Sequence, residues 1–487
     1  MRPFGVRFPA MSLRAHLTPL DLGAVLGQLA GLVWMMGWLL LLPAALGWVC
    51  REFLVAALLS GLSVVALVLG RWGRALLPKD LRIREAFVVT ALAYPLFALA
   101  GAIAFLPVAP FIDGFFESMS GFTTTGLTVV DVRALPRSLR FFRAYMQWIG
   151  GAGIVILSVA VWNATRPAGF RFRIYGSAPE DERVAGSVHA NARQLVAIYG
   201  LLTAVVCVAF LIVGMPIEDA VLHGLATIST GGFSPHAASI GHYASNPAVL
   251  TVTMVGMLLG ATSFSNYQRL ARRGQGGKHH RDPQVYALAC VVLVGASLLF
   301  ALEGHPWHAV FDTVSAVTTT GFSLDQPTNW SPTRKLFATL WMVIGGSSGS
   351  TAGGLKLMRL IVLLKLAQWT IRRSLLPPEA QVPLKYAGTV IDTEPLRHLL
   401  GFMVAYLLLL LAGGTALVLA GFAPQDALFE SASAIGTVGL SSGITNADLP
   451  TWTKLVLSLE MWAGRLEVLP VLVLLYPGTW KLRRRSR

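Results

Sequence analysis

Long apolar stretches alternate with short polar segments along most of the chain. Ten stretches are candidates for membrane-crossing helices, because a spanning helix needs about 20 predominantly apolar residues. They cover residues 20–49, 53–70, 86–106, 143–162, 194–215, 248–265, 284–302, 334–371, 398–421 and 454–477. The eighth stretch is too long for one crossing and contains the Gly- and Ser-rich segment 345–354. We therefore expect the helix to break in that segment.

The composition agrees with a polytopic membrane protein and excludes a set of soluble domains. Charged residues make up 13% of the 487 residues, apolar residues make up 54%, and the mean hydropathy is +0.63. Soluble domains carry about 25% charged residues. The net charge of +15 is held in short clusters between apolar stretches. No basic domain with interleaved aromatic residues is present to bind nucleic acid, so nucleic acid is not an expected partner.

The distribution of Lys and Arg predicts the orientation of the chain. Cytoplasmic loops of membrane proteins carry an excess of these residues. Most of the 39 Lys and Arg residues lie in one alternating set of connecting segments, which includes both termini. The opposite, outer set holds eight: Arg51, Arg133, Arg137, Arg140, Arg143, Arg334, Lys335 and Lys454. We therefore expect a multi-pass protein of the cell (inner) membrane with both termini in the cytoplasm.

Four segments on the outer side share one pattern of residues. They read FFESMSGFTTTGLT, VLHGLATISTGGFS, AVFDTVSAVTTTGFS and ALFESASAIGTVGLS, and they end at Thr128, Ser234, Ser323 and Ser441. When they are aligned, a threonine recurs at Thr124, Thr230, Thr319 and Thr437, and a glycine recurs two residues later at Gly126, Gly232, Gly321 and Gly439. Eleven residues before the threonine stand Asp113, Asp219, His308 and Asp426, and seven before it stand Glu117, His223, Asp312 and Glu430.

Close packing of membrane helices through small residues is the alternative explanation for any single cluster. Four clusters in one register, each between two apolar stretches, favour an internal repeat instead. The predicted fold is an all-α polytopic membrane protein with ten spans, in which four pseudo-fourfold units of span, pore helix, filter loop and span surround one ion pore. Two extra N-terminal spans lie in residues 1–80, and the units lie in 81–168, 185–275, 282–375 (with a broken second span) and 390–487.

The repeated pattern suits the binding of a dehydrated cation. Non-helical backbone is tolerated at membrane depth only where protein or a water-filled cavity surrounds it. Four loops around one axis would form a ring of carbonyl oxygens, as in a potassium filter. Glycine allows the required backbone angles and close approach. Asp113, Asp219 and Asp426 suit the positive N-termini of half-crossing helices, or they simply cap them.

These residues resemble a known family. Gly436-Thr437-Val438-Gly439-Leu440 is similar to the potassium-channel signature TVGYG, with Leu in place of Tyr. Four such units in one chain resemble the Trk/Ktr/HKT superfamily of potassium transporters, and the two additional N-terminal spans resemble its TrkH-type subunit most closely. The resemblance extends over residues 20–480, although the second loop departs from the pattern through an extra glycine.

The resemblance implies potassium uptake through a channel-like pore and no enzymatic activity. In the superfamily a serine at the first-loop glycine accompanies sodium permeability, and this chain has Gly126 there. The expected cargo is therefore K⁺, and no organic cofactor is expected in this chain. The implied ion-binding residues are Thr124, Thr125, Gly126, Thr230, Gly231, Gly232, Thr319, Thr320, Gly321, Thr437, Val438 and Gly439.

The resemblance also implies partners. We expect a homodimer surrounded by membrane lipid and a cytosolic, nucleotide-binding TrkA-like regulatory subunit. The chain itself contains no nucleotide-binding motif. The basic loops 166–193, 269–283 and 372–397 are the expected docking surface for this subunit.

Two intramembrane features are candidates for a gate. In the superfamily a break at the place of 345–354 forms a gating loop below the filter, and a passive kink is the alternative. The gate residues here would be Gly345, Gly346, Gly349, Gly353, Gly354 and Lys356. Arg465 stands where the other repeats have Gly151, Ala261 and Gly346. We expect it to project into a cavity below the filter and slow ion flux, with a salt bridge to Glu460 or Glu467 as the alternative.

Two other classes of function fit the sequence less well than a potassium pore does. A secondary transporter of an organic solute predicts inverted repeats and polar groups near the middle of the membrane. The repeats here are parallel, and their Thr/Gly clusters lie on one side. A membrane enzyme is disfavoured because the ten histidines form no HExxH motif or other metal pair within a span. Passive flux and flux coupled to protons or sodium both remain open, as does the nucleotide that the partner senses.

Overall fold

The structure is a computed structural model that describes residues 20–73, 82–164, 188–271, 282–303, 305–377, 380, 382–386, 389–391 and 393–480. Its regular elements are helices, apart from one antiparallel pair of strands, β1 (Lys385–Tyr386) and β2 (Thr389–Val390). Short 3₁₀ turns occur at Val132–Ala134, Ser239–Tyr243, Pro327–Asn329 and Pro477–Trp480. Both termini and most of the basic loops 166–193 and 269–283 lie outside the described residues.

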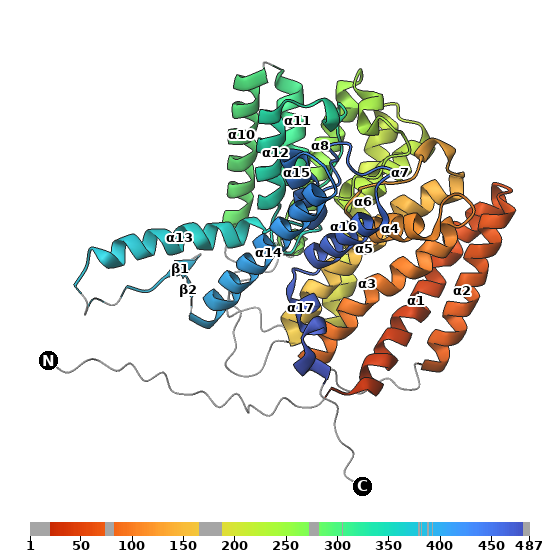
Figure 1. Cartoon of the computed structure of the whole chain (residues 1–487), viewed down its shortest axis with the longest axis horizontal. Coiled ribbons are helices and arrows are strands. Elements are labelled where there is room, and N and C mark those ends of the chain that lie inside the picture. Colours follow the sequence, from red (N-terminus) through yellow and green to blue (C-terminus); the bar gives the residue numbers. More distant parts are fainter. Residues whose placement is uncertain are drawn as a thin grey trace, which may run out of the picture.

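The two predicted N-terminal spans are helices that form a hairpin at one edge of the molecule, α1 (Leu22–Val49) and α2 (Phe53–Gly73) (Figure 1). Small residues let their backbones approach closely. The Ser63 hydroxyl donates to the Gly37 carbonyl at 2.7 Å, and a Cβ atom on Gly70 would lie 2.5 Å from the Trp34 backbone nitrogen. Such packing holds helices together in lipid, where the hydrophobic effect between helices is absent.

The same order of helices then occurs four times in the described chain. The first helix is long: α3 (Ile83–Phe105), α6 (Val188–Ile212), α10 (Pro283–Glu303) and α14 (Thr393–Leu419). The next has 12 residues: α4 (Phe111–Phe122), α7 (Ile217–Ile228), α11 (Pro306–Val317) and α15 (Pro424–Ile435). A loop leads to a second helix: α5 (Arg137–Ala164), α8 (Pro247–Ala261), α12 (Pro332–Ile344) and α16 (Thr451–Arg465). Each long helix packs on the short helix that follows it.

Among the described residues, six helices are long and apolar enough to cross a membrane: α1, α2, α3, α6, α10 and α14. Their outward side chains are apolar; Leu201, Leu293 and Leu408 are 64%, 67% and 62% exposed. By contrast, Glu117 and Glu430 on the short helices are fully buried. Extended apolar surface around a polar interior is expected of a protein whose surroundings are lipid.

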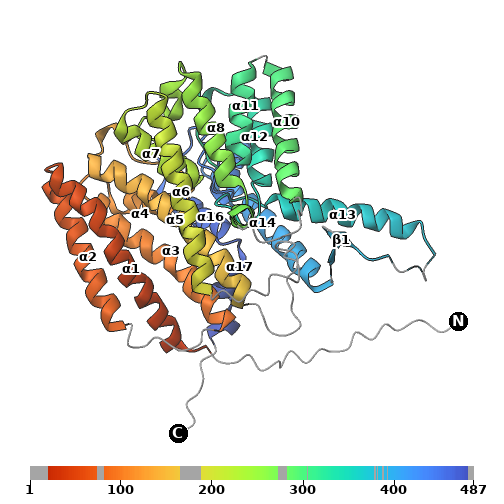
Figure 2. The same ribbon diagram turned by 180° about the vertical axis from the view of Figure 1, so that it is seen from behind.

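The long apolar stretch 334–371 breaks where the sequence predicts. Helix α12 ends at Ile344, and α13 (Leu357–Ser374) begins after the segment 345–354. Helix α13 and the β1–β2 pair then extend sideways from the helical body (Figures 1 and 2).

Two other predicted spans are wrong as continuous helices. Within 248–265, α8 ends at Ala261 and the chain turns by 91° into α9 (Phe264–Ala271). The turn is fixed because the Phe264 N–H donates to the Gly349 carbonyl at 2.9 Å. Within 454–477, α16 ends at Arg465 and α17 (Leu469–Leu475) follows a break. Glu467 and Val468 have φ of 57° and 62° there, and left-handed residues cannot continue a right-handed helix.

Candidate functional site

The four Thr/Gly loops have the same backbone conformation. The threonines have φ of 55°, 51°, 53° and 51°, and the glycines two residues later have φ of 98°, 75°, 84° and 95°. Positive φ is rare for a β-branched residue, and such strain persists where the surroundings enforce it, commonly at functional sites. The extra glycine of the second loop does not shift its register, since Thr230 and Gly232 have the angles of their counterparts.

The loops meet in a closed ring of backbone atoms. Each repeat glycine lies so close to a carbonyl oxygen of the adjacent loop that a Cβ atom would overlap it. In order around the ring, the contacts are Gly126 with Gly231, Gly232 with Thr320, Gly321 with Val438 and Gly439 with Thr125. We call these eight residues the four-loop ring. Each loop therefore touches the next in one direction, which is the geometry expected for fourfold pseudosymmetry.

The short helices and the second helices both converge on the start of the loops. Helices α4, α7, α11 and α15 end immediately before the loops, so their partly negative C-terminal ends adjoin them. In three repeats a glycine of the second helix packs against the carbonyl of the last short-helix residue. These pairs are Gly150 with Phe122, Gly260 with Ile228 and Gly464 with Ile435. In the third repeat, Gly345 has φ of 72° and ends α12 instead.

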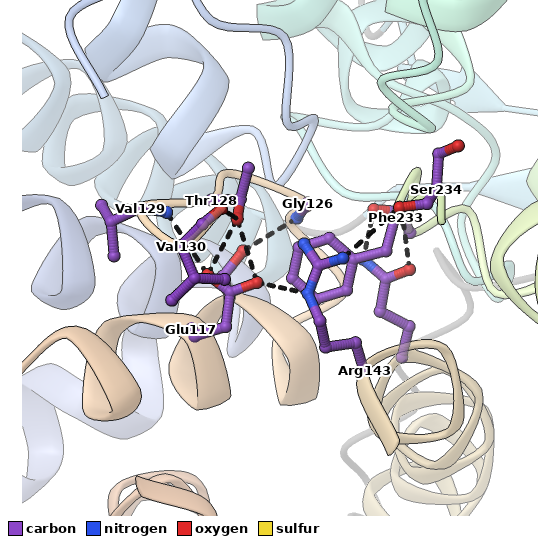
Figure 3. A network of polar contacts seen from close by, with 11 residues as sticks. Glu117, Gly126, Thr128, Val129, Val130, Arg143, Phe233 and Ser234 are labelled. Carbon is purple, nitrogen blue, oxygen red and sulfur yellow. Dashed lines mark hydrogen bonds and ion pairs between the residues drawn. The ribbon is translucent and has the colours of Figure 1, made fainter. Parts of the chain in front are cut away.

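The residue seven positions before the repeat threonine braces the loop in three of the repeats. Its side chain bonds to a hydroxyl four positions after the threonine, as Figure 3 shows for the first repeat. The pairs are Glu117 with Thr128 at 3.0 Å, His223 with Ser234 at 3.1 Å and Glu430 with Ser441 at 2.8 Å. Asp312, in the third repeat, pairs with Arg334. In the first, second and fourth repeats, the loop is thus held at both ends by its own short helix.

Ion pairs connect the outer cations with acids of the short helices. Lys454 of α16 lies 2.6 Å from Asp113 of α4, and Lys335 of α12 lies 2.8 Å from Asp426 of α15. The cations in such pairs are Arg137, Arg140, Arg143, Arg334, Lys335 and Lys454. Asp113 and Asp426 occupy the first helical turn, as predicted. Their carboxylates also bind a neighbouring repeat, so these acids join adjacent repeats as well as complementing the helix ends.

Asp219, the acid at this position in the second repeat, has local partners instead. Its carboxylate lies 2.6 Å from His236 Nε2 and accepts a hydrogen bond from the Tyr243 hydroxyl. The rings of His236 and His242 are stacked with centroids 3.9 Å apart. Burial, together with the adjacent Asp219 carboxylate, raises the pKa of Tyr243. This cluster holds the segment after the second loop against α7.

The segment 345–354 lies against the threonine end of the ring. The Gly353 N–H donates to Thr319 Oγ1 at 2.7 Å, and a Cβ atom on Gly353 would overlap both Thr437 Oγ1 and the Gly436 carbonyl. The Thr351 hydroxyl donates to the Ile228 carbonyl at 3.0 Å. The segment therefore touches the starts of three loops, and we call it the intramembrane loop.

Arg465 joins the intramembrane loop to α5. Its side chain is 3% exposed, and its two terminal nitrogens donate to the carbonyls of Thr351 at 2.6 Å and Gly150 at 2.9 Å. The two acids considered as salt-bridge partners have other partners of their own. Glu467 pairs with Lys356 and Arg359, and Glu460 accepts a hydrogen bond from Ser431 at 2.6 Å.

The break in the fourth repeat holds the far end of the intramembrane loop. Lys356, at the start of α13, has φ of 71°, and its Nζ lies 2.8 Å from the Glu467 carboxylate. Arg359, one turn further along α13, binds the same carboxylate. Two interrupted helices are thus joined to each other at their breaks by two buried cations that share one partly exposed carboxylate.

The structure brings the twelve predicted filter residues to one place. Of the predicted gate residues, Gly353 contacts these loops directly, whereas Gly349 lies beside Ser263 and Lys356 pairs with Glu467. Two residues at this site are not among those predicted from the sequence: Gln147, which contacts the second loop, and Arg359, which contacts Glu467. For Gln147 a signal exists, because a polar amide inside an apolar stretch needs hydrogen-bond partners. Arg359 carries no such signal, since it lies near the end of a long stretch that already contains Lys356.

Comparison with known proteins points to one family. The profile of the TrkH family, described as a cation transport protein, matches residues 75–279 and 299–478. An uncharacterized cation transporter of Methanocaldococcus jannaschii is 30% identical, over 96% of this chain and 99% of that protein. The Trk system potassium uptake protein TrkH of Vibrio parahaemolyticus is 32% identical, over 82% and 87%. The crystal structure of the potassium transporter TrkH from the same organism superimposes with a TM-score of 0.83 at 28% identity, over 95% of this chain and 100% of that one.

Proposed function

The chain belongs to the TrkH family of cation transport proteins, and we propose that it takes up K⁺ across the cell membrane through the four-loop ring. It is a membrane transporter and not an enzyme. The observation that carries the proposal is the closed cyclic contact of four glycines with four carbonyl oxygens. Carbonyls held at fixed positions around an axis replace the water shell of a dehydrated K⁺ ion.

In this proposal the four Thr/Gly loops form the filter, with the threonine hydroxyls at its inner end. The ion-binding residues are those that the sequence predicts, from Thr124–Gly126, Thr230–Gly232, Thr319–Gly321 and Thr437–Gly439. The chain crosses the membrane ten times, and the four short helices enter from the outside and turn back. Residues 1–80 supply two accessory spans, and the four units of the pore lie in 81–168, 185–275, 282–375 and 390–487.

The intramembrane loop and Arg465 form the proposed gate. Gly353 and Thr351 lie against the inner ends of three filter loops, so an ion leaving the filter meets this loop next. The positive φ of Gly345, Gly349 and Gly354 marks backbone that glycine adopts at little cost. Movement of the loop away from Thr319 would open the path to the cytoplasm.

The proposed assembly is a homodimer in lipid that is regulated by a cytosolic, nucleotide-binding subunit similar to TrkA. Curated relatives carry the name Trk system potassium uptake protein, which denotes a system of several components. Helix α13, directly connected to the intramembrane loop, extends from the helical body (Figure 1). Binding of a subunit to α13 or the loops beside it would therefore act on the gate through Lys356.

Electrical recording from the purified protein in bilayers tests the proposal. With a K⁺ gradient, and with Na⁺ and H⁺ gradients varied independently, the reversal potential should follow K⁺. Substitution of Gly126→Ser should lower the K⁺/Na⁺ permeability ratio, because the added side chain overlaps the Gly231 carbonyl. Gly200→Ser is the matched control, since a Cβ atom there meets nothing within 4 Å. A reversal potential that ignores K⁺, or an unchanged ratio in folded Gly126→Ser protein, would contradict the proposed filter.

A further inference from the structure

The second filter loop lacks a side chain that the other three loops possess. The residue before the repeat glycine is Thr125, Thr320 or Val438 in the first, third and fourth loops, and each of these is fully buried. In the first loop Thr125 Oγ1 lies 2.8 Å from Thr123 Oγ1, and the third loop has the same hydroxyl pair. The second loop has Gly231 at this position, so it can form neither the packing nor the pair.

Gln147 of α5 occupies the place of the missing side chain. A Cβ atom on Gly231 would overlap the side-chain amide carbon of Gln147. Gln147 is fully buried; its Nε2 donates to the Gly231 carbonyl, and its Oε1 accepts from the Phe233 N–H at 3.0 Å. The two bonds fix the amide orientation, because the nitrogen can only donate and the oxygen can only accept. The extra glycine in the sequence is therefore explained by a side chain from another helix.

The Gly231 carbonyl belongs to the four-loop ring, where it faces Gly126. It accepts a side-chain hydrogen bond there, whereas the described residues supply no such bond to the carbonyls of Thr125, Thr320 and Val438. A donor on a carbonyl holds its direction and reduces the negative charge that the oxygen offers to an ion. The direction of one of the four carbonyls in the ring is thus determined by a side chain of α5, whereas no side chain binds the other three among the described residues.

Arg143 provides further contacts between α5 and the second loop. It lies four residues before Gln147, which places both side chains on one helix face. Its guanidinium lies over the Phe233 ring, 3.9 Å from the centroid, and contacts the Ser234 carbonyl at 3.4 Å (Figure 3). The same guanidinium lies 2.5 Å from Glu117, which braces the first loop. The first and second loops are therefore tied to one face of α5.

We propose that Gln147 is a positioning residue for ion selectivity, which replaces the missing side chain of Gly231 and orients the Gly231 carbonyl in the ring. The proposal rests on the proposed function of the ring as a K⁺ filter. It adds that selectivity depends on a residue outside the filter loops, and that positions 147 and 231 are coupled.

Three variants test the coupling. Gln147→Ala removes both the side chain that packs against Gly231 and the hydrogen-bond donor to its carbonyl. It should lower the K⁺/Na⁺ permeability ratio by about fivefold, the effect of one lost hydrogen bond. Gly231→Thr alone should nearly abolish flux, because its side chain overlaps Gln147. The double variant Gln147→Ala/Gly231→Thr builds the side chain from the loop itself, as in the first and third loops, and should recover a higher ratio than Gln147→Ala.

Gln147→Met supplies a variant of similar length should the alanine variant fail to fold. A thioether has no hydrogen to donate to Gly231, so the ratio should fall with this variant too. Gln284→Ala is the matched control: Gln284 is another buried glutamine, but its Oε1 accepts from the Ser348 N–H of the intramembrane loop at 2.7 Å. Its loss should change total flux and leave the ratio intact.

Each result decides between the proposal and a purely structural role. If Gln147→Ala and Gln147→Met lower thermal stability or flux but keep the wild-type K⁺/Na⁺ permeability ratio, Gln147 only supports the fold and the proposal is wrong. If the K⁺/Na⁺ permeability ratio of the double variant is no higher than that of Gln147→Ala, Gln147 does not replace a missing side chain of the second loop. Wild-type protein that does not distinguish K⁺ from Na⁺ would instead contradict the proposed function.

Discussion

Removal of the Arg465 side chain should release the intramembrane loop and raise K⁺ flux in the absence of a regulatory subunit. Arg465 donates one hydrogen bond to Thr351 in the loop and one to Gly150 in α5. If the loop moves when the pore opens and α5 does not, only the bond to Thr351 is lost on opening. That bond therefore stabilises the closed state relative to the open state.

The size of the effect follows from the chemistry of this bond. A hydrogen bond from a charged donor contributes about 1.5–3 kcal/mol, and each 1.36 kcal/mol corresponds to a factor of ten. A value of about 2 kcal/mol shifts the open population by about thirtyfold. A unit charge about 5 Å from a passing ion adds about 3 kcal/mol at an effective dielectric constant near 20. Both effects oppose flux, so Arg465→Ala should increase it by at least one order of magnitude.

Arg465→Lys separates the two effects. Lysine keeps the charge, but its single ammonium group cannot reproduce the planar fork that spans two carbonyls. The sequence alone predicts that the positive charge at position 465 is the main cause of the slow K⁺ flux. On that basis lysine should keep most of the restraint on flux. The two hydrogen bonds in the structure lead us to expect an intermediate flux, well above that of the wild type. The measurement is K⁺ efflux from proteoliposomes containing the purified protein without partner.

A matched control comes from another arginine that donates to two backbone carbonyls. Arg84 of α3 donates to the backbone carbonyls of Gly478 and Thr479, away from the intramembrane loop. Arg84→Ala should lower thermal stability without raising flux. The K⁺/Na⁺ ratio should stay near the wild-type value in all Arg465 variants, since the filter lies above the substitution. Wild-type flux from correctly assembled Arg465→Ala protein would refute the reasoning.

Three further predictions concern the ring, the gate and the links between repeats. Gly439→Ala should abolish K⁺ flux in bilayer recordings, because the φ of 95° at this residue disfavours a side chain and the added Cβ atom overlaps the Thr125 carbonyl. Gly153→Ala is the control: a Cβ atom there has no neighbour within 4 Å, so this variant should conduct normally. Glu467→Gln should weaken the bonds to Lys356 and Arg359 and raise partner-free flux about tenfold, an effect of one weakened charged bond; flux equal to that of wild type would exclude a role of these pairs in closure. Lys454→Met should lower the free energy of unfolding by about 3–5 kcal/mol, because it leaves Asp113 buried without its cation. In a thermal denaturation assay, the double variant Lys454→Met/Asp113→Asn should recover part of this loss.

The sequence predicts the ring well because the ring depends on backbone angles that are specified locally, by a threonine and a glycine in each loop. Threonine with positive φ followed by glycine with positive φ recurs at each predicted position, and a repeat register transfers the assignment from one loop to the next. The break at 345–354 is equally visible, since ten Gly, Ser, Thr and Ala residues cannot continue an apolar span.

The interruptions at Thr262 and Glu467 could not be predicted in the same way. Residues 262 and 263 are neither glycine nor proline, so local propensity gives no signal at the first break. At the second, Pro470 in the first turn of α17 favours a helix start, but it does not reveal the left-handed residues before it. The first turn is stabilised by the bond from Phe264 to Gly349, and the second by the pairing of Glu467 with Lys356 and Arg359. Both depend on the position of a distant segment. For the same reason the partner of Gly231 could be named only after α5 was placed beside the second loop.

The proposed gate occurs at a position that the repeat itself defines. In the first, second and fourth repeats, a glycine of the second helix packs on the end of the short helix and the helix continues past it by at least one residue. In the third repeat the equivalent Gly345 has φ of 72° and the helix stops. The chain therefore leaves the helix at the level where the other three touch the filter loops. A break one turn earlier or later would set the intramembrane loop away from Thr319 and Thr437, so the register that builds the four-loop ring also determines where the proposed gate can act.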